Sequence, residues 1–190
     1  MEDRDLIWEE ISTEHIIQDE WIDFRRSAFR FPDGRVFQPY YTYTRRDYSV
    51  VVASDEEGKF LCVRQFRQGI RQVTNEFPAG AIEAKDGSTA AEAALEGAKR
   101  ELREETGYVS DCWTPLLVIP SNATSSDNIA YLFRAENCRR VTDQDLDEME
   151  LIDVRKYTAE ELDDLIRKGQ FQQSVHVLAW LLARQAGTIR

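Results

Sequence analysis

Residues 89–106, TAAEAALEGAKRELREET, are the segment that most constrains how this chain can fold. The segment is dense in alanine, leucine, glutamate, lysine and arginine, the residues with the highest helix propensities. Ser88 or Thr89 can cap its start, and Gly107 can end it. One central helix flanked by strand-like segments indicates a layered fold. We therefore expect an α/β or α+β architecture.

Short apolar runs supply the strands expected around this helix. DYSVVVAS and KFLCVRQFR, separated by residues 55–58, form the clearest hairpin. Residues 74–88 are rich in turn-forming side chains. The remaining elements follow the central helix and are strand-like stretches at 113–119, 129–134 and 150–154, then two amphipathic helices separated by Gly169.

The N-terminal part of the chain has a different character. Residues 5–46 alternate apolar and polar side chains, and Pro32-Asp33-Gly34 interrupts the alternation, which predicts antiparallel strands joined by a tight turn. The segment is rich in aromatic residues, and a short extension cannot hide that much apolar surface by itself. We expect residues 1–46 to form a strand extension that promotes a homodimer, and residues 47–190 to form the main domain.

Composition excludes several classes of protein. The chain has 190 residues, 42% of them hydrophobic, which is enough for one packed core. Its formal net charge of −11 disfavours nucleic acid as a partner. No apolar run approaches the roughly 20 residues that span a bilayer, the start is acidic where a signal peptide would be basic, and the three cysteines fit reduced thiols. We expect a cytoplasmic protein that binds neither nucleic acid nor membrane.

Three glutamates of the central helix are the first candidate site. Glu101, Glu104 and Glu105 are spaced i, i+3 and i+4, so their carboxylates project from one helix face. Hard divalent cations such as Mg²⁺ are commonly held by a few carboxylates together with substrate phosphates. The competing interpretation is a solvated acidic face balanced by Lys99, Arg100 and Arg103.

The surrounding sequence favours the metal site. RELREETGY, residues 100–108, resembles the second half of the Nudix hydrolase signature, Arg-Glu-apolar-x-Glu-Glu-x-Gly-apolar, with Tyr108 where an aliphatic residue is more usual. VRQFRQG and EFPAGAIE resemble the strand and loop before the helix in the ADP-ribose pyrophosphatase-like branch. This resemblance implies a sandwich of helices around a mixed sheet. It also implies hydrolysis of the diphosphate bond of ADP-ribose or a nucleotide sugar, giving a nucleoside monophosphate and a sugar phosphate.

One spacing departs from the family pattern. The loop glycine and the helix arginine are fourteen positions apart in the family, whereas Gly80 and Arg100 are twenty apart here (100 − 80 = 20). Counting back from Arg100 places Asp86 at the position of the glycine. We take Gly80 as the structural glycine, because Phe-Pro-Ala precedes it. Glu92 and Glu83 both remain candidates for the family's other glutamate.

The resemblance also implies the metal ligands. Glu101 and Glu105 would hold Mg²⁺ or Mn²⁺, Glu104 would assist, and the backbone carbonyl of Ala79 would complete the set. Arg100 would orient the carboxylates. A Nudix-like nucleotide-binding module that regulates another protein is the alternative function, although such a module has little need for three crowded carboxylates.

Three further expectations rest on the same resemblance. Glu148 or Glu150 in DEMELIDV would be the base that deprotonates the attacking water, and we favour Glu148, with Glu150 nearer the metal. Arg67 would bind the substrate diphosphate through its planar donor fork. Trp21 and Tyr40 would stack a nucleobase, in competition with a packing role. Residues 121–127 lie where the terminal sugar would be recognised, and they lack the Ser-Pro-Gly of this branch.

Overall fold

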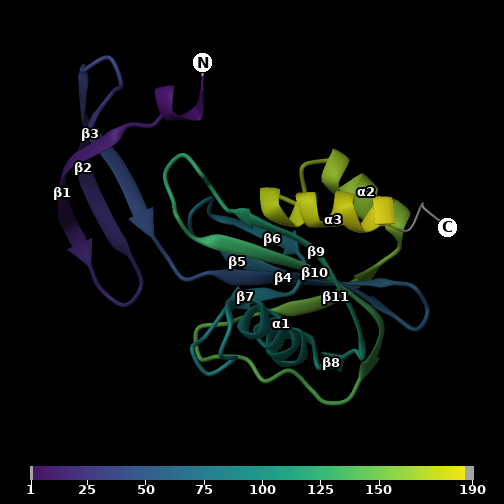
Figure 1. Ribbon diagram of the computed structural model, residues 1–190. Helices are drawn as coiled ribbons and strands as arrows, with labels where there is room; N and C mark the ends of the chain where they lie inside the picture. The colour runs from purple at the N-terminus through teal and green to yellow at the C-terminus, as the bar shows by residue number, and fades with distance from the viewer. Residues whose placement is uncertain (1, 187–190) are drawn as a thin grey trace. The chain divides into compact units, whose positions relative to one another are not determined.

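The computed structural model describes residues 2–186, which divide into two compact units (Figure 1). One unit comprises Met1–Arg46 with Pro120–Ile129, and the other comprises Asp47–Ile119 with Ala130–Arg190. The loop at 120–129 therefore belongs with the N-terminal segment, from which it is distant in sequence. Among the helices of residues 2–186, none combines the length and the apolar character that crossing a membrane requires.

The N-terminal unit is a three-stranded antiparallel sheet in the order β1-β2-β3. Its strands are β1 (Glu9–Gln18), β2 (Asp23–Arg30) and β3 (Val36–Thr44), after a short 3₁₀ helix, η1 (Asp3–Asp5). The expected turn joins β2 to β3, and Gly34 adopts a φ of 90° there, a conformation that glycine tolerates best. A second turn separates β1 from β2, where the Asp19 carboxylate accepts hydrogen bonds from the backbone of Trp21 and Ile22. The predicted antiparallel strands are confirmed.

The 120–129 loop is fixed to β3 within the same unit. Tyr43 and Ser126 form a parallel β-bridge. The Asp127 carboxylate accepts hydrogen bonds from the Thr44 hydroxyl at 2.6 Å and from Arg25 at 3.0 Å. Because both backbone and side-chain bonds join them, the loop and β3 form one local structure.

The second unit contains a mixed eight-stranded sheet whose main order is β11-β5-β4-β10-β8. Strand β10 pairs with β4 in parallel, and the other strand pairs that we describe are antiparallel. The strands are β4 (Tyr48–Asp55), β5 (Phe60–Arg67), β6 (Gln72–Glu76), β7 (Ala79–Ala81), β8 (Tyr108–Val109), β9 (Cys112–Pro120), β10 (Ile129–Arg140) and β11 (Asp153–Tyr157). The β4–β5 hairpin is confirmed. Two predictions are wrong, since β6 and β7 lie in the stretch expected to be turns, and β11 begins at Asp153 rather than at residue 150.

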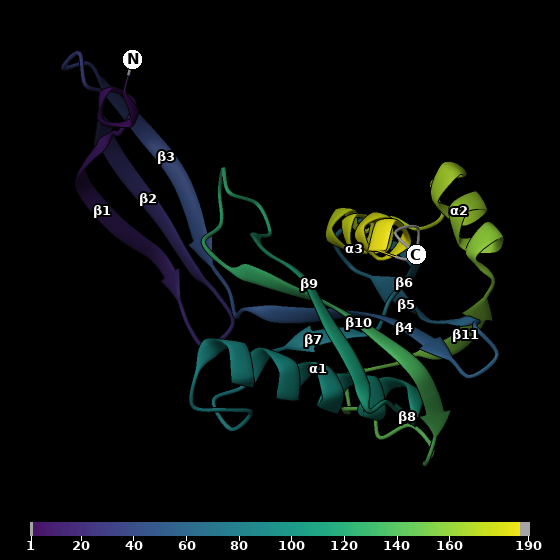
Figure 2. The same ribbon diagram turned by 45° about the vertical axis from the view of Figure 1, so that its right-hand side comes forward.

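Helices cover both faces of this sheet (Figure 1, Figure 2). The helix α1 (Ala90–Thr106) lies on one face, while α2 (Ala159–Arg167) and α3 (Ser174–Ala186) lie on the other. The Thr89 hydroxyl caps α1 by accepting from the Glu92 amide, and Gly107 ends it with a φ of 78°. Both predicted helix boundaries are confirmed, as is the α/β/α sandwich.

The core is built by the alternation of side chains along β4. Val51 and Ala53 pack on one face with the α1 residues Ala94, Ala98 and Leu102. Val50 and Val52 pack on the opposite face with residues of α2 and α3, including the fully buried Trp180. Burial on both faces explains the continuous apolar run in β4. Strand β7 pairs with β4, and both strands contact α1, so β7 lies beside that helix.

Candidate active site

Two glutamates of α1 are buried against β7. The residues Glu101 and Glu105 are only 8% and 2% exposed, and they lie one helical turn apart. One carboxylate oxygen of Glu105 accepts a hydrogen bond from the backbone N–H of Ala79 at 3.0 Å. This bond joins the helix directly to the Pro78-Ala79-Gly80 segment.

Gly80 is required by the Glu101 carboxylate. A Cβ atom added at Gly80 would overlap all three atoms of the carboxylate group of Glu101. The glycine therefore provides the space that the carboxylate occupies, which supports Gly80 as the structural glycine of the sequence pattern.

A Gly80→Ala variant tests this close approach. We expect the free energy of unfolding to fall by about 1–3 kcal/mol, the usual cost of overpacking, because Glu101 or the β7 backbone must move. Thermal denaturation measures the change. A Gly58→Ala variant is a comparison at a turn with open space, where only the positive φ is strained. Wild-type stability together with wild-type divalent-ion dependence in Gly80→Ala would contradict the close approach.

The two buried carboxylates repel one another. Burial raises the pKa of Glu101 to about 7 and raises the pKa of Glu105 well above its ordinary value. The charges of Glu101 and Glu150 raise the pKa of Glu105 further. A group of desolvated acids is stabilised by a bound cation.

Arg100 neutralises the outer part of the cluster. Its guanidinium donates to Glu101 at 2.8 Å and to Glu104 at 2.9 Å from the same nitrogen. The other nitrogens contact both oxygens of Asp86 at 3.2 Å, and one donates to the Ala81 carbonyl at 2.9 Å. With so many partners, the Arg100 side chain is held in one orientation and orients Glu101 and Glu104 in turn.

The long spacing between Gly80 and Arg100 is accommodated by the loop between β7 and α1. Asp86, at the position where counting back from Arg100 would require glycine, bonds the arginine instead. Glu83 approaches Arg100 at 3.7 Å. Glu92 accepts from the backbone and hydroxyl of Ser88, so it caps the start of α1. Of the two candidates for the remaining glutamate, Glu83 is the one that contacts Arg100.

Arg67 lies at the end of β5 and is paired with Glu76 on the neighbouring β6. Two parallel hydrogen bonds, at 2.8 and 2.5 Å, join the guanidinium to the carboxylate. The Glu76 side chain is fully buried, whereas 36% of the Arg67 side chain is exposed. The hydrogen bonds with Glu76 raise the pKa of Arg67, and the negative charges of Glu105 and Glu150 raise it further. The outer edge of the guanidinium therefore stays available beside the acidic cluster.

Glu148 and Glu150 lie in a turn before β11, and they differ in environment. Glu150 is half-buried, and its charge raises the pKa of both Glu101 and Glu105. Glu148 is exposed. The turn is closed by reciprocal bonds between Asp147 and Glu150. The structure thus brings Glu150 toward the buried glutamates.

The loop that carries Glu150 is attached to the end of α1. The side-chain amide of Gln144 donates to the Glu105 carbonyl at 2.7 Å and to the Ile152 carbonyl at 3.3 Å. The Asp145 amide donates to the Glu104 carbonyl at 2.9 Å. These bonds satisfy helix-terminal carbonyls and fix the base of the Glu150 loop relative to the glutamates.

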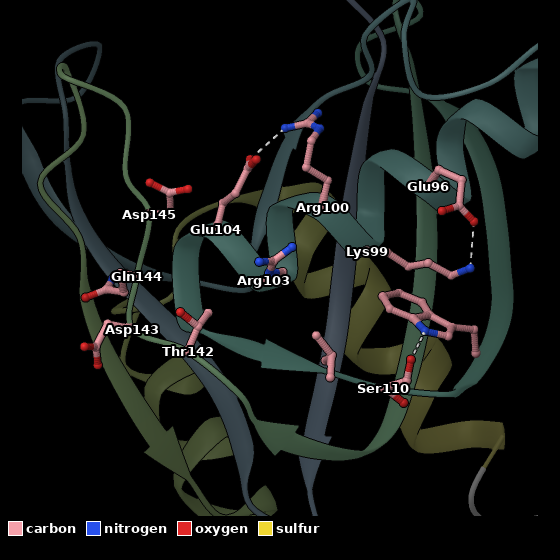
Figure 3. Close-up of a pocket in the computed structure, with 12 residues that line it drawn as sticks. Glu96, Lys99, Arg100, Arg103, Glu104, Ser110, Thr142, Asp143, Gln144 and Asp145 are labelled. Carbon is pink, nitrogen blue, oxygen red and sulfur yellow. Dashed lines mark hydrogen bonds and ion pairs between the residues drawn. The ribbon is translucent and has the colours of Figure 1, made fainter.

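A separate groove of about 550 Å³ lies along the outer face of α1. Figure 3 shows Arg100 and Glu104 paired at its rim, Arg103 projecting into it, and the 142–145 loop on one side. Glu101 and Glu105 do not line this groove. The groove is therefore lined by Arg100 and Glu104, which neighbour the buried carboxylates, and not by the buried carboxylates themselves.

The donor set fits a hard divalent cation. Across residues 2–186, no three His, Cys, Asp or Glu side chains form a preassembled metal cage. Mg²⁺ does not need one, because it usually keeps several waters and binds one or two carboxylates together with phosphate oxygens. Glu101 and Glu105 supply such carboxylates, and the missing Cβ of Gly80 leaves room for them.

Trp21 and Tyr40 belong to the N-terminal unit. Trp21 is 63% exposed in the turn between β1 and β2, and the Arg46 guanidinium lies over its ring at 5.9 Å. Tyr40 contacts Trp8, Phe29 and Phe37 edge-on, and its hydroxyl donates to the Thr124 carbonyl at 2.7 Å. Tyr40 thus has the packing role that we weighed against base stacking, whereas most of the Trp21 side chain is exposed.

Sequence reasoning missed the residues that support the site. Glu76 immediately precedes Phe-Pro-Ala-Gly, but it is opposite Val63 in the β5–β6 register, so the strand pairing alone does not indicate its side-chain pairing with Arg67. Asp86 was noticed only as a departure from the pattern. Gln144 carried no local signal, because its two partners are backbone carbonyls of other segments.

Comparisons with known proteins agree with this geometry. A family model described as NUDIX domain matches residues 44–181. The chain is 27% identical over 179 residues to an ADP-ribose pyrophosphatase of Bacillus subtilis (strain 168), covering 93% of each chain. It is 26% identical over 171 residues to a methanol dehydrogenase activator of Bacillus methanolicus, covering 89% of this chain and 88% of the relative.

A solved structure supports the fold. The crystal structure of an ADP compounds hydrolase superposes with a TM-score of 0.78 over 96% of each chain, at 18% sequence identity. At that identity the likeness concerns the fold alone. The matched family model covers more than half of the chain and includes the β7–α1 glutamate cluster. The chain therefore belongs to the Nudix family, and it is a Nudix pyrophosphohydrolase that resembles the ADP-ribose pyrophosphatase branch.

Proposed function

We propose that this enzyme uses Mg²⁺ to hydrolyse the diphosphate bond of ADP-ribose or a related nucleotide sugar, and that it releases a nucleoside monophosphate and a sugar phosphate. The observation that carries the proposal is the pair of buried carboxylates, Glu101 and Glu105, beside the Ala79-Gly80 backbone and within electrostatic reach of Arg67 and Glu150. The similarity to an ADP-ribose pyrophosphatase supports the substrate class.

Each residue of the cluster has a distinct role in this proposal. Glu101 and Glu105 hold the cation, with the Ala79 carbonyl and Glu104 assisting, and Mn²⁺ can substitute. When bound, Mg²⁺ would offset charge on the phosphate oxygens and make water a better nucleophile. Arg100 keeps Glu101 and Glu104 oriented through the bonds described above.

The hydrolytic step requires a base and a cation for the diphosphate. Water attacks one phosphorus in line, Glu150 accepts its proton, and the bond to the bridging oxygen breaks, so that each product carries one phosphate. We assign the base to Glu150 rather than to Glu148, because the charge of Glu150 acts on the buried glutamates. The free edge of Arg67 binds non-bridging oxygens of the diphosphate.

A substrate panel with product analysis tests the proposal. ADP-ribose, other nucleotide sugars and nucleoside triphosphates are incubated with and without Mg²⁺, and the products are separated. We expect nucleoside monophosphate and sugar phosphate, formed only with a divalent ion. Reaction in H₂¹⁸O should place the label in one of the two products. Hydrolysis of none of the nucleotide sugars would reject the proposal.

A regulatory role is the second candidate function, because one relative is a methanol dehydrogenase activator. Such a module would bind a nucleotide and act on another protein without substantial turnover. Tight binding of ADP-ribose by equilibrium dialysis, with no product after prolonged incubation with Mg²⁺, would favour it.

We also propose that the enzyme is a homodimer formed through the N-terminal unit, whose aromatic residues help bind the base of the partner's substrate. The three-stranded sheet supports this through its exposed apolar side chains, which include Ile17, Trp21, Val36, Phe37 and Tyr41, each 46–63% exposed. Base stacking is assigned to Trp21, which is 63% exposed, whereas Tyr40 supports the sheet through its packing contacts.

Light scattering at micromolar concentration checks the dimer prediction. We expect the mass of two chains, and a Phe37→Ser change combined with Val36→Ser should shift the mass toward one chain and lower activity. A Val118→Ser variant, which changes a 59% exposed apolar residue of β9, is the control and should leave the mass unchanged. A fully active monomer would contradict the prediction.

A further inference from the structure

Helix α3 carries none of the site residues described above. Two side chains at or just before its start nevertheless contact Glu76 and Phe77, which adjoin that site. The Gln173 amide, just before α3, donates to the Glu76 carboxylate at 3.3 Å. His176, in the first turn, is 4% exposed, and its Nδ1 atom accepts from the backbone N–H of Phe77 at 3.1 Å. Both contacts join α3 to the two segments that border the buried glutamates.

The first contact acts on Arg67. Glu76 is fully buried, and its carboxylate receives both bonds of Arg67, a bond from the Thr74 hydroxyl and the bond from Gln173. A buried carboxylate surrounded by donors has one orientation, and the arginine that it holds shares that orientation. Gln173 donates to the same Glu76 oxygen as Thr74 and the Arg67 Nε–H, so it is part of the set of donors that holds Glu76 against Arg67.

The second contact acts on the backbone before Gly80. The Phe77 amide is held by His176, and the Ala79 amide is held by Glu105. The Phe77-Pro78-Ala79 segment is therefore fixed at both ends, from α3 on one side and from α1 on the other. Burial lowers the pKa of His176 to about 4, so the ring is neutral near pH 7 and its Nδ1 can accept while Nε2 carries the proton.

The segment that leads into α3 is itself attached to β6 and Phe77, and this attachment holds Gln173 and His176 in place. The Asn75 side chain donates to the Gln170 carbonyl at 2.8 Å. Phe171 is buried against Phe77, with ring centroids 5.0 Å apart. The 170–176 segment is thus fixed alongside β6.

We infer that Gln173 and His176 are positioning residues for hydrolysis. Gln173 orients Arg67 through Glu76, and His176 orients the Phe77–Gly80 backbone, which presents the Ala79 carbonyl. The inference rests on the proposed function in one respect, namely that Arg67 binds the substrate diphosphate. It assigns a supporting role in the site to Gln173 and His176, which are far in sequence from the glutamates of α1.

Steady-state kinetics with ADP-ribose test the Gln173 contact. We expect Gln173→Met to raise KM about five- to tenfold with kcat within about twofold, because Arg67 contributes to substrate binding in ground and transition states alike. The matched control is Gln172→Met, which removes a neighbouring amide whose hydrogen bond within residues 2–186 goes to Gln72 rather than to Glu76, and which should leave KM unchanged. An unchanged KM in Gln173→Met would overturn the inference.

A double variant separates positioning from general destabilisation. In an Arg67→Gln background, Gln173→Met should have no further effect on KM, because residues acting through one another are not additive. An equal increase in both backgrounds would show that Gln173 does not act through Arg67 and would overturn the inference.

His176 is tested with a pair of variants. Asparagine can keep an acceptor near the position of Nδ1, whereas leucine removes it. We expect His176→Asn to retain activity within a few-fold and His176→Leu to raise the Mg²⁺ concentration needed for half-maximal rate. Thermal midpoints identify variants that fail to fold, and equal Mg²⁺ requirements for two folded variants would overturn the role of His176.

A measurement without turnover keeps this inference distinct from the proposed function. The Arg67 Nε–H group, assigned by the loss of its ¹⁵N–¹H NMR signal in Arg67→Lys, should exchange slowly with solvent because it is bonded to buried Glu76. We expect this proton to exchange faster in Gln173→Met, and at the wild-type rate in Gln172→Met. If the enzyme hydrolyses no nucleotide sugar, the proposed function fails, while this exchange rate still supports or overturns the positioning of Arg67.

Discussion

Replacing Glu105 with glutamine is expected to lower kcat by roughly a hundredfold or more, beyond the effect usual for residues that only support a metal ligand. The amide keeps the shape of the side chain but loses the charge that a hard cation requires. The metal-free variant should unfold at a temperature no lower than the wild type, since it removes a buried charge that repels Glu101. Kinetics with varied Mg²⁺ and thermal denaturation with chelator measure the two effects.

Glu96→Gln is the matched control on the same helix. Glu96 is exposed on the outer face of α1, and its ion pair in the described part of the chain is with Lys99, at 2.7 Å. Its replacement should leave kcat and the Mg²⁺ requirement near wild type. If Glu105→Gln were as active as Glu96→Gln, the assignment of the buried carboxylates to metal binding would be wrong.

The second large effect is expected for Glu150→Gln. A positioned general base contributes about 10²–10⁴-fold, so kcat should fall by that factor. The Mg²⁺ concentration for half-maximal rate should change much less than in Glu105→Gln, because Glu150 is assigned to the water and not to the cation. Rate measurements over a range of pH and Mg²⁺ concentrations separate the two behaviours.

Glu148→Gln provides the comparison within the same turn. Glu148 is exposed, and we expect its variant to retain most activity. The sequence alone favoured Glu148 as the base, so a large loss of kcat in Glu148→Gln with little in Glu150→Gln would restore that assignment. Wild-type kcat in both variants would place the base elsewhere, in the glutamate helix or the 122–127 loop.

Local sequence signals predicted the elements that are stabilised locally. Thr89, the helix-forming residues after it and Gly107 specify α1 from end to end, because capping and propensity act within a few residues. The β4–β5 hairpin follows for the same reason, since its turn and its two strands are contiguous. The same helix spacing also brought Glu101 and Glu105 together correctly.

Elements that depend on distant partners could not be predicted in this way. β7 contains Gly80 and follows Pro78, which both favour turns, and it is a strand only because β4 pairs with it. Glu150 was expected to alternate along a strand, but β11 starts later and the Asp147–Glu150 turn sets its direction. Glu76 is a buried carboxylate, and the sequence alone does not distinguish it from a glutamate on the surface. Its burial depends on the ion pair with Arg67 of the neighbouring strand.

The attachment of the 120–129 loop to β3 has a consequence for how substrate preference can change. The loop lies where the resemblance to ADP-ribose pyrophosphatases implies recognition of the terminal sugar, and its conformation depends on Tyr43, Thr44 and Arg25 of the N-terminal sheet. Exchanging the loop sequence alone would remove the Asp127 carboxylate that the Thr44 and Arg25 side chains bind. A change of substrate preference would therefore require the 120–129 loop to be exchanged together with β2 and β3. Among related enzymes, substitutions in the loop should occur together with substitutions at the positions of Arg25 and Thr44.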